Sequence, residues 1–179
     1  MSSIKRRELK AFLNGLSKEQ LIEQIAALCD AVPQAADFYR TKLRAEDDAT
    51  VAQEYKEKIR REFARWSTGG FRLSSARKLV TDFAKVAGSA GTAVDVMLTY
   101  VEEGIDAVLY VGGLDASFAN SMVGMYRNAV HRVVQHDLQA EYGARCDALR
   151  AKGGPLGWGL GDDLDEIYME YLFDDPAEA

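Results

Sequence analysis

The residues best suited to chemistry in this sequence are positively charged and gather between Lys56 and Lys85. This segment, called the basic band below, holds nine lysines and arginines against three acids. Its central stretch "RWSTGGFRLSSARK" places two serines beside arginines at the expected start of a helix, where free N–H groups favour an anion. A phosphate group or a nucleic-acid backbone would suit such a site, whose candidate residues are Arg60, Arg61, Arg65, Arg72, Ser74, Ser75, Arg77 and Lys78.

The charge distribution offers a simpler interpretation of the same cations. Residues 1–90 carry a net charge of +5, whereas residues 91–179 carry −11. The band lacks the spacing of a phosphate-binding loop and any nucleic-acid-binding motif, and a pI near 5.0 opposes nonspecific binding to DNA. We therefore favour cations that pair with the acidic half or lie in solvent over a dedicated anion site.

The remaining reactive residue types form no recognisable catalytic or metal-binding pattern. His131 and His136 are five residues apart, about 140° around a helix, so they do not share a face as metal ligands four apart would. Cys29 and Cys146 lie far apart among apolar neighbours, which is typical of reduced packing residues. The sequence therefore predicts no catalytic residue, no metal and no cofactor, and it favours a protein that is not an enzyme.

Apolar residues recur at spacings of three and four along most of the chain, which predicts an all-α fold. Turn signals divide the pattern into about nine helices, arranged as a compact bundle or as stacked antiparallel pairs resembling a HEAT array. A length of 179 residues suits a single domain over 1–179, with a basic lobe (1–90) and an acidic lobe (91–179) as a possible subdivision.

The first three expected helices each have an apolar face that the pattern turns toward the core. They cover residues 4–14, a segment from 17 that opens with the capping box "SKEQ", and residues 33–44. The residues expected to be buried are Leu9, Phe12 and Leu13 in the first, Leu21, Ile22, Ile25 and Leu28 in the second, and Phe38, Tyr39 and Leu43 in the third.

Turn signals set the later boundaries. Asp47 or Asp48 is the expected cap of a helix over 49–66, and Gly104 the expected end of one that starts near residue 92. Residues 105–113 suit a short helix or a strand equally well. Before this segment we also expect a helix over 75–87. After it we expect two helices that meet at Asp137 and a last helix over 163–173.

The stretch "GGPLGWGLG" at residues 153–161 combines five glycines with one tryptophan. Glycine permits positive φ and close backbone approach, so this segment is expected to lie flat on the preceding helices and deliver the last one. Trp158 is then either a buried structural anchor or an exposed recognition residue.

Three blocks of the sequence also resemble a family. "KRRELKAFLNGLSKEQLIEQI", "EYKEKIRREFARWSTGGFRLSSARKLVTDFAKV" and "GPLGWGLGDDLDEIYMEYL" are similar to those of an uncharacterised bacterial family of small helical proteins, filed as a domain of unknown function. Members often have an aromatic residue and a histidine after Gly-Trp-Gly, where this chain has Leu160 and Gly161, so a catalytic role for the block is not implied. The resemblance implies one helical domain and supplies no activity.

These observations predict a cytoplasmic interaction module that binds an unknown protein partner. No apolar run approaches the roughly 18–20 residues of a membrane span, and the N-terminus lacks a signal-peptide core, so no membrane association is expected. Binding of a phosphate ligand or nucleic acid through the basic band is the alternative.

Overall fold

The structure is a computed structural model that describes residues 4–65, 72–113, 115–157 and 159–173. These residues form nine helices and no strand, which confirms the all-α prediction. The helices are α1 (Arg6–Asn14), α2 (Lys18–Ala31), α3 (Pro33–Leu43), α4 (Ala45–Phe63), α6 (Leu73–Val86), α7 (Ala90–Val111), α8 (Ala116–Gln135), α9 (Gln139–Gly153) and α10 (Leu160–Tyr171).

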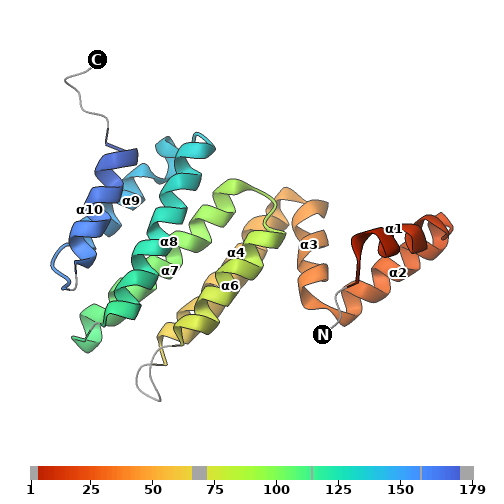
Figure 1. Ribbon diagram of the computed structural model, residues 1–179, viewed down its shortest axis with the longest axis horizontal. Helices are drawn as coiled ribbons and strands as arrows, with labels where there is room; N and C mark the ends of the chain where they lie inside the picture. The colour runs from red at the N-terminus through yellow and green to blue at the C-terminus, as the bar shows by residue number, and fades with distance from the viewer. Residues whose placement is uncertain (1–3, 66–71, 114, 158, 174–179) are drawn as a thin grey trace.

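The helices follow one another in a row of antiparallel pairs (Figure 1). Helix α4 pairs with α6, α7 with α8, and α9 with α10, and each pair packs against the next. Helix α3 stands against α4 and α6, and the α1–α2 hairpin forms the far end of the row. Of the two predicted architectures, the arrangement is therefore the stack of antiparallel pairs.

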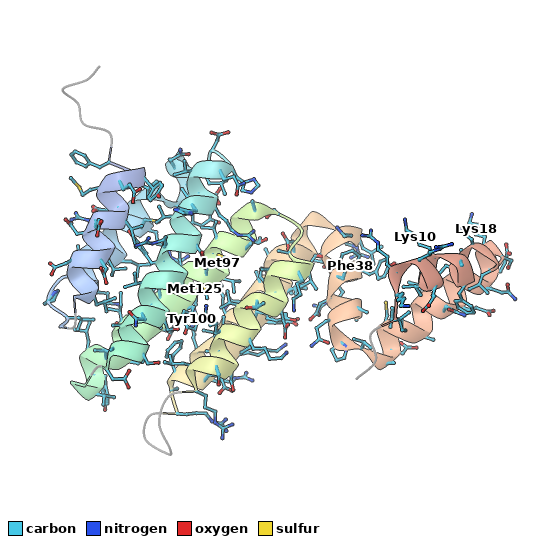
Figure 2. All side chains as sticks on the ribbon, viewed as in Figure 1. Lys10, Lys18, Phe38, Met97, Tyr100 and Met125 are labelled. Atoms are coloured by element: carbon cyan, nitrogen blue, oxygen red, sulfur yellow. The ribbon has the colours of Figure 1, made fainter. Side chains whose placement is uncertain are left out.

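Helix α7 is the centre of the core. It packs against α4, α6, α8 and α9, and an apolar residue occupies most of its positions, as expected for a helix buried on several sides. Val94, Leu98 and Val101 have no exposed surface. Figure 2 shows Met97 and Tyr100 of α7 near Met125 of α8, where the two helices meet.

Two predicted features of α7 have a clear outcome. The helix does not end at Gly104, as predicted, but continues to Val111, so residues 105–111 are helical and not a strand. Gly104 is internal because α8 approaches it closely: a Cβ atom there would lie 2.2 Å from the Met122 sulfur. The helix ends instead at Gly112, whose φ of 73° is the left-handed conformation that glycine adopts without strain.

The start of α4 also differs from the prediction. The helix begins at Ala45, so neither Asp47 nor Asp48 is its cap. The buried Asp48 carboxylate instead accepts a hydrogen bond from the Gly88 backbone N–H and one from the Thr92 hydroxyl, both at 2.8 Å. The turn between α6 and α7 is therefore held on α4 by one carboxylate.

Other local signals are confirmed. The Ser17 hydroxyl accepts from the Gln20 N–H, and the Gln20 side chain accepts from the Ser17 N–H, which completes the predicted capping box. Helices α8 and α9 meet around Asp137, whose φ is 55°.

The glycine-rich segment joins α9 to α10 through a close backbone contact. A Cβ atom on Gly161 would lie 2.5 Å from the Gly154 carbonyl oxygen, and Gly159 has a φ of 72°. Helix α10 begins at Leu160, three residues earlier than predicted, because Leu160 is itself buried in the core. The close backbone approach expected of this segment is found at Gly161 and the positive φ at Gly159, whereas Trp158 falls outside the described residues.

The predicted burial of the first three helices is wrong. Neither α1 nor α2 buries a residue, and Phe12, Ile22 and Leu43 are 55%, 58% and 75% exposed. All three helices are amphipathic. Helices α1 and α2 lie beyond α3 at the end of the row, and α3, although it packs against α4 and α6, leaves Phe38, Tyr39 and Leu43 exposed. The periodicity identified an apolar face correctly, yet that face meets solvent.

Candidate functional site

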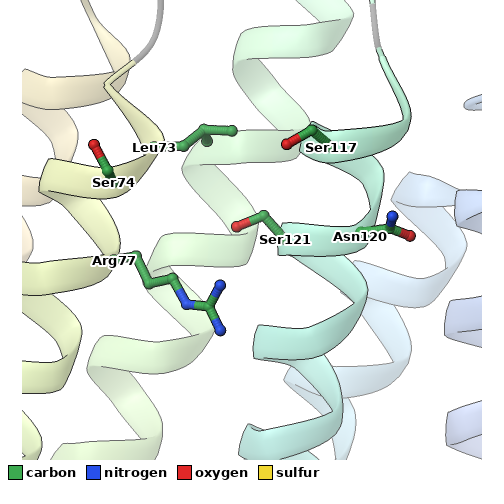
Figure 3. A pocket seen from close by; sticks show the side chains of 6 residues that line it. All are labelled: Leu73, Ser74, Arg77, Ser117, Asn120 and Ser121. Carbon is green, nitrogen blue, oxygen red and sulfur yellow. The ribbon is translucent and has the colours of Figure 1, made fainter.

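A polar pocket lies between the first turns of α6 and α8. Leu73, Ser74 and Arg77 line it from α6, and Ser117, Asn120 and Ser121 from α8 (Figure 3). Its volume is about 670 Å³, enough for a small ligand. The structure thus brings two residues of the predicted anion site, Ser74 and Arg77, together with three polar residues that sequence reasoning did not include.

Arg77 gives this pocket its positive charge. No carboxylate of the described residues pairs with its guanidinium, which Figure 3 shows pointing from α6 toward α8. The Ser121 hydroxyl is 2.7 Å from the Tyr100 hydroxyl, so one polar group of the lining is held by the core. The pocket could therefore hold one anionic group between a cation and neutral hydroxyls.

The two helix N-termini at the pocket are not equivalent. Asp115 caps α8 by accepting from the Phe118 N–H at 2.8 Å, so a carboxylate already occupies that N-terminus. Helix α6 follows Arg72 and has no side-chain cap among the described residues. An anion in the pocket would thus meet free N–H groups on the α6 side and a like charge beside α8.

The other cations of the basic band are mostly paired. Arg60 bonds Glu103 at 2.9 Å, and Lys56 bonds Asp95 at 2.7 Å, so two ion pairs join the basic half to the acidic half. Arg61 and Arg65 lie 3.8 and 3.9 Å from Glu57 and Glu62. Lys78 and Lys85 both bond Asp82, and Ser75 is half-buried outside the pocket.

The Asp82 carboxylate, which receives two of these cations, is held in its charged form. Hydrogen bonds from Lys78 and Lys85 lower the pKa of Asp82 below its ordinary value. A band neutralised within its own fold offers little net charge to a nucleic-acid backbone, whose affinity depends on the number of phosphates neutralised. Among the predicted anion-site residues, Arg72 and Arg77 are the exposed cations left without a described acidic partner.

An ion-pair network around Arg145 was missed by sequence reasoning. Arg145 of α9 bonds Asp95, Thr99 and Glu102 of α7, while Lys56 of α4 bonds the second oxygen of Asp95. Burial alone would raise the pKa of Asp95, but the hydrogen bonds from Lys56 and Arg145 outweigh it and lower that pKa. The network ties three helices together, so its carboxylates serve structure and are not a free acid–base pair.

Nucleophiles and metal ligands are not gathered anywhere in the described part of the chain. Burial raises the pKa of the Cys146 thiol to about 12, which makes it a poor nucleophile. His131 makes an edge contact with the Tyr171 ring, with centroids 4.5 Å apart. No group of three potential metal ligands occurs among these residues.

Most of the large apolar residues that are exposed lie at the opposite end of the row from α10. We call it the N-terminal face and define it by the large exposed apolar residues of α1, α2 and α3: Leu9, Phe12, Ile22, Ile25, Leu28, Phe38, Tyr39 and Leu43. Figure 2 shows Phe38 where α3 adjoins the hairpin, and Lys10 and Lys18 along the hairpin's edge. Exposed apolar residues that gather on neighbouring helices are typical of sites of association.

The other end of the row is finished differently. Helix α10 turns Leu164 and Ile167 into the core and exposes acids, among them Asp165, Glu166 and Glu170. A polar outer face is what a terminal helix pair needs if it is to end a stack in water. The row is thus capped at α10 and uncapped at α1–α3.

Among the described helices, none is both long and apolar enough to cross a membrane.

Comparison with known proteins places the chain in a family without assigning a function. A search of curated proteins and a search of solved structures each found no match. A family model described as "Family of unknown function (DUF6155)" matches residues 4–172, which spans every described helix. The chain therefore belongs to this family of unknown function, DUF6155.

Proposed function

We propose that this protein is a non-enzymatic interaction module that binds a macromolecular partner through the N-terminal face. The observation that carries the proposal is the exposure of eight large apolar residues on three consecutive helices that bury almost nothing. Scattered exposed apolar residues are ordinary, but eight of them gathered on three consecutive helices at one end of a helical row are what a binding surface would present.

The energetics support binding at this face. Covering one leucine, isoleucine or phenylalanine side chain is worth roughly 1.5–3 kcal/mol, so a few anchors suffice for a specific complex after the cost of association. Aromatic anchors such as Phe12, Phe38 and Tyr39 are residue types enriched at interfaces. We expect partner binding to be dominated by apolar burial and to depend little on salt.

Affinity purification from the host lysate tests the proposal. The tagged wild-type chain is compared with Phe12→Ser/Ile22→Ser and with Met169→Ser, which removes a 45% exposed apolar residue at the capped end. We expect a protein that is retained in high salt and after nuclease, lost by the double variant and kept by Met169→Ser. Equal recovery with all three chains would contradict binding at the N-terminal face.

A second candidate function is the binding of a single phosphate group in the Arg77 pocket. Support comes from the Arg77 guanidinium, which has no acidic partner among the described residues and points toward α8, where Ser117 and Ser121 line the same pocket. Calorimetric titration with inorganic phosphate tests it. Arg77→Gln should weaken binding about tenfold, since a hydrogen bond to a charged group is worth about 1.5–3 kcal/mol. Arg61→Gln, an equal loss of charge on α4, should leave binding within about twofold. Equal weakening by both variants would indicate nonspecific charge attraction and overturn the site.

We also place the protein in the cytoplasm. Both cysteines are free thiols, and Cys146 is fully buried without a disulfide partner, which suits a reducing compartment. Cell fractionation followed by immunodetection tests this, and recovery with the membrane or secreted fraction would overturn it.

A further inference from the structure

The α1–α2 hairpin is poorly supported by the rest of the chain. Helix α1 has nine residues and α2 fourteen, lengths at which an isolated helix in water is marginal, and neither buries a residue. Their apolar stripes still follow a core-facing pattern, with Leu9, Phe12 and Leu13 on α1 and Leu21, Ile22, Ile25 and Leu28 on α2. A hairpin with this pattern needs an apolar partner of similar shape.

We infer that the partner is a second copy of this chain, and that two α1–α2 hairpins pack together as a four-helix bundle about a two-fold axis. The inference rests on the proposed function, because it uses the N-terminal face as the binding surface. Two identical hairpins supply four short helices with their apolar stripes inward, which is the standard solution for helices of this kind.

The charges of the two helices favour a second copy over a partner of one sign. Residues 4–16 carry four cations and one acid, a net +3, whereas residues 17–32 carry one cation and three acids, a net −2. An acidic partner, or an anionic bilayer, would attract α1 and repel α2, and a basic partner would do the reverse. A second copy presents both signs, and a two-fold arrangement can set each α1 beside the partner's α2.

The capped end of the row decides between a closed pair and a chain of copies. Joining the N-terminal face of one copy to α10 of the next would bury acids such as Asp165 and Glu166 against apolar residues. Packing face to face leaves both α10 helices in solvent. The expected assembly is therefore a closed dimer, with the two rows extending away from a central bundle.

Sedimentation velocity on the full-length chain tests the inference. We expect the wild type to sediment as two chains of 19.8 kDa each at tens of micromolar. Phe12→Asp/Ile22→Asp should give a monomer, because each aspartate would place a charge inside the bundle. Met169→Asp, the matched change at the capped end, should remain a dimer. Circular dichroism and the main thermal transition, which report the core around α7, should stay near those of the wild type in both variants.

A charge variant tests the relative placement of the helices. Arg6→Glu/Lys10→Glu changes the net charge of residues 4–16 from +3 to −1, so α1 would repel the partner's α2. We expect dimerisation to weaken about tenfold near 10 mM salt and to approach that of the wild type near 0.5 M, because salt screens the repulsion. Equal weakening at both salt concentrations would overturn the α1-beside-α2 arrangement.

The outcomes separate this inference from the proposed function. A wild-type monomer at these concentrations overturns the dimer, as does a dimer that survives Phe12→Asp/Ile22→Asp. If the wild type is a monomer but still captures a protein that Phe12→Ser/Ile22→Ser loses, the interaction module stands and its partner is a different protein. If the wild type is a dimer, Phe12→Asp/Ile22→Asp is a monomer and Met169→Asp remains a dimer, the partner at the N-terminal face is a second copy of the chain.

Discussion

The Asp48 carboxylate accepts a hydrogen bond from the Gly88 backbone N–H at 2.8 Å, and no room is left for a side chain on Gly88. A Cβ atom on Gly88 would lie 3.0 Å from the Asp48 carboxyl carbon and 2.8 Å from the Thr41 carbonyl oxygen. The turn that leads from α6 into α7 therefore sits directly on α3 and α4. This contact joins the central pairs to the helices that carry the N-terminal face.

Replacing Asp48 tests how strongly that junction contributes to folding. Asp48→Ala leaves the Gly88 N–H without its acceptor and the Thr92 hydroxyl with only Ser89 as a partner, whose carbonyl oxygen is 3.1 Å away, and we expect a loss of about 1–3 kcal/mol in the free energy of unfolding. Urea denaturation followed by circular dichroism measures it. Asp47→Ala, its neighbour on the same turn, should change stability by less than about 0.5 kcal/mol. Similar values for the two variants would show that the junction is not held by Asp48.

The prediction of Asp48 as a helix cap shows what one sequence can and cannot reveal. Aspartate before a run of helix formers is a good cap signal, and the residue is indeed a hydrogen-bond acceptor for a turn. Its donors, however, come from Gly88 and Thr92, some forty residues later. Local spacing identified the chemistry of the side chain, whereas its partner depends on how α4, α6 and α7 pack.

Replacing Gly161 tests the close contact between α9 and α10. A Cβ atom there would lie 2.5 Å from the Gly154 carbonyl oxygen, which is backbone and cannot rotate away. We expect Gly161→Ala to lower the free energy of unfolding by about 1–3 kcal/mol through overpacking. Gly157→Ala is the control, because no atom lies within 4 Å of a Cβ at that position. Equal midpoints in urea for the two variants would contradict the contact.

Helix type and order were predictable because they depend on spacing within one segment. The packed faces of α4, α6, α7, α8 and α10 follow their apolar periodicity, and the Ser17 capping box is local by construction. Periodicity could not say whether an apolar face meets the same chain or another one. The faces of α1–α3 therefore looked like core to the sequence, and their exposure is the observation on which the proposed binding surface rests.

Only the α6 side of the candidate pocket could be predicted, because only its residues lie close together in the sequence. Ser74 and Arg77 lie one turn apart on α6, so the sequence placed them together. Ser117, Asn120 and Ser121 reach the same pocket from α8, forty or more residues later, and polar residues on a helix give no signal of what they face. Arg145 was overlooked similarly, since its carboxylate partners lie on α7.

The Arg145 network predicts a pH-dependent contribution to stability. The folded state holds the pKa of Asp95 below its ordinary value of about 3.9, so the contribution is complete above that value and disappears as pH falls through the folded pKa. We expect Asp95→Asn to cost about 1–3 kcal/mol at pH 7, and this difference from the wild type to shrink below about pH 4. Urea denaturation of both proteins between pH 2.5 and 7 measures it.

The matched control for Asp95 is Asp162→Asn, which neutralises an exposed aspartate in the first turn of α10. Its effect should stay within about 0.5 kcal/mol at pH 7, as expected for one charge near a helix terminus. If Asp95→Asn behaves like this control, the network around Arg145 makes no net contribution to folding.

Trp158 stays a prediction from sequence, because it lies outside the described residues. If Trp158 is a buried anchor between α9 and α10, Trp158→Ala should lower the free energy of unfolding by about 3–5 kcal/mol. As an exposed recognition residue it should leave the melting temperature unchanged and weaken partner binding. Thermal denaturation of Trp158→Ala, with the pull-down described above, separates the two, and tryptophan fluorescence quenching of Trp66→Phe reports the exposure of Trp158 directly.

The two cysteines predict opposite reactivities and so report on different parts of the fold. At pH 8 the Cys146 thiol, whose pKa burial raises to about 12, should be almost entirely protonated as well as inaccessible. Cys29 is half-buried on α2 and should react with a disulfide reagent first. Mass spectrometry of the labelled protein should show one modified thiol under native conditions and two in urea.

Because α1 and α2 bury nothing within the chain, labelling of Cys29 should proceed without unfolding of the core, whereas Cys146 should react at the rate of global opening. Equal native rates for the two thiols would mean that the core around α7 opens as readily as the hairpin, which would contradict the full burial of Cys146 in that core.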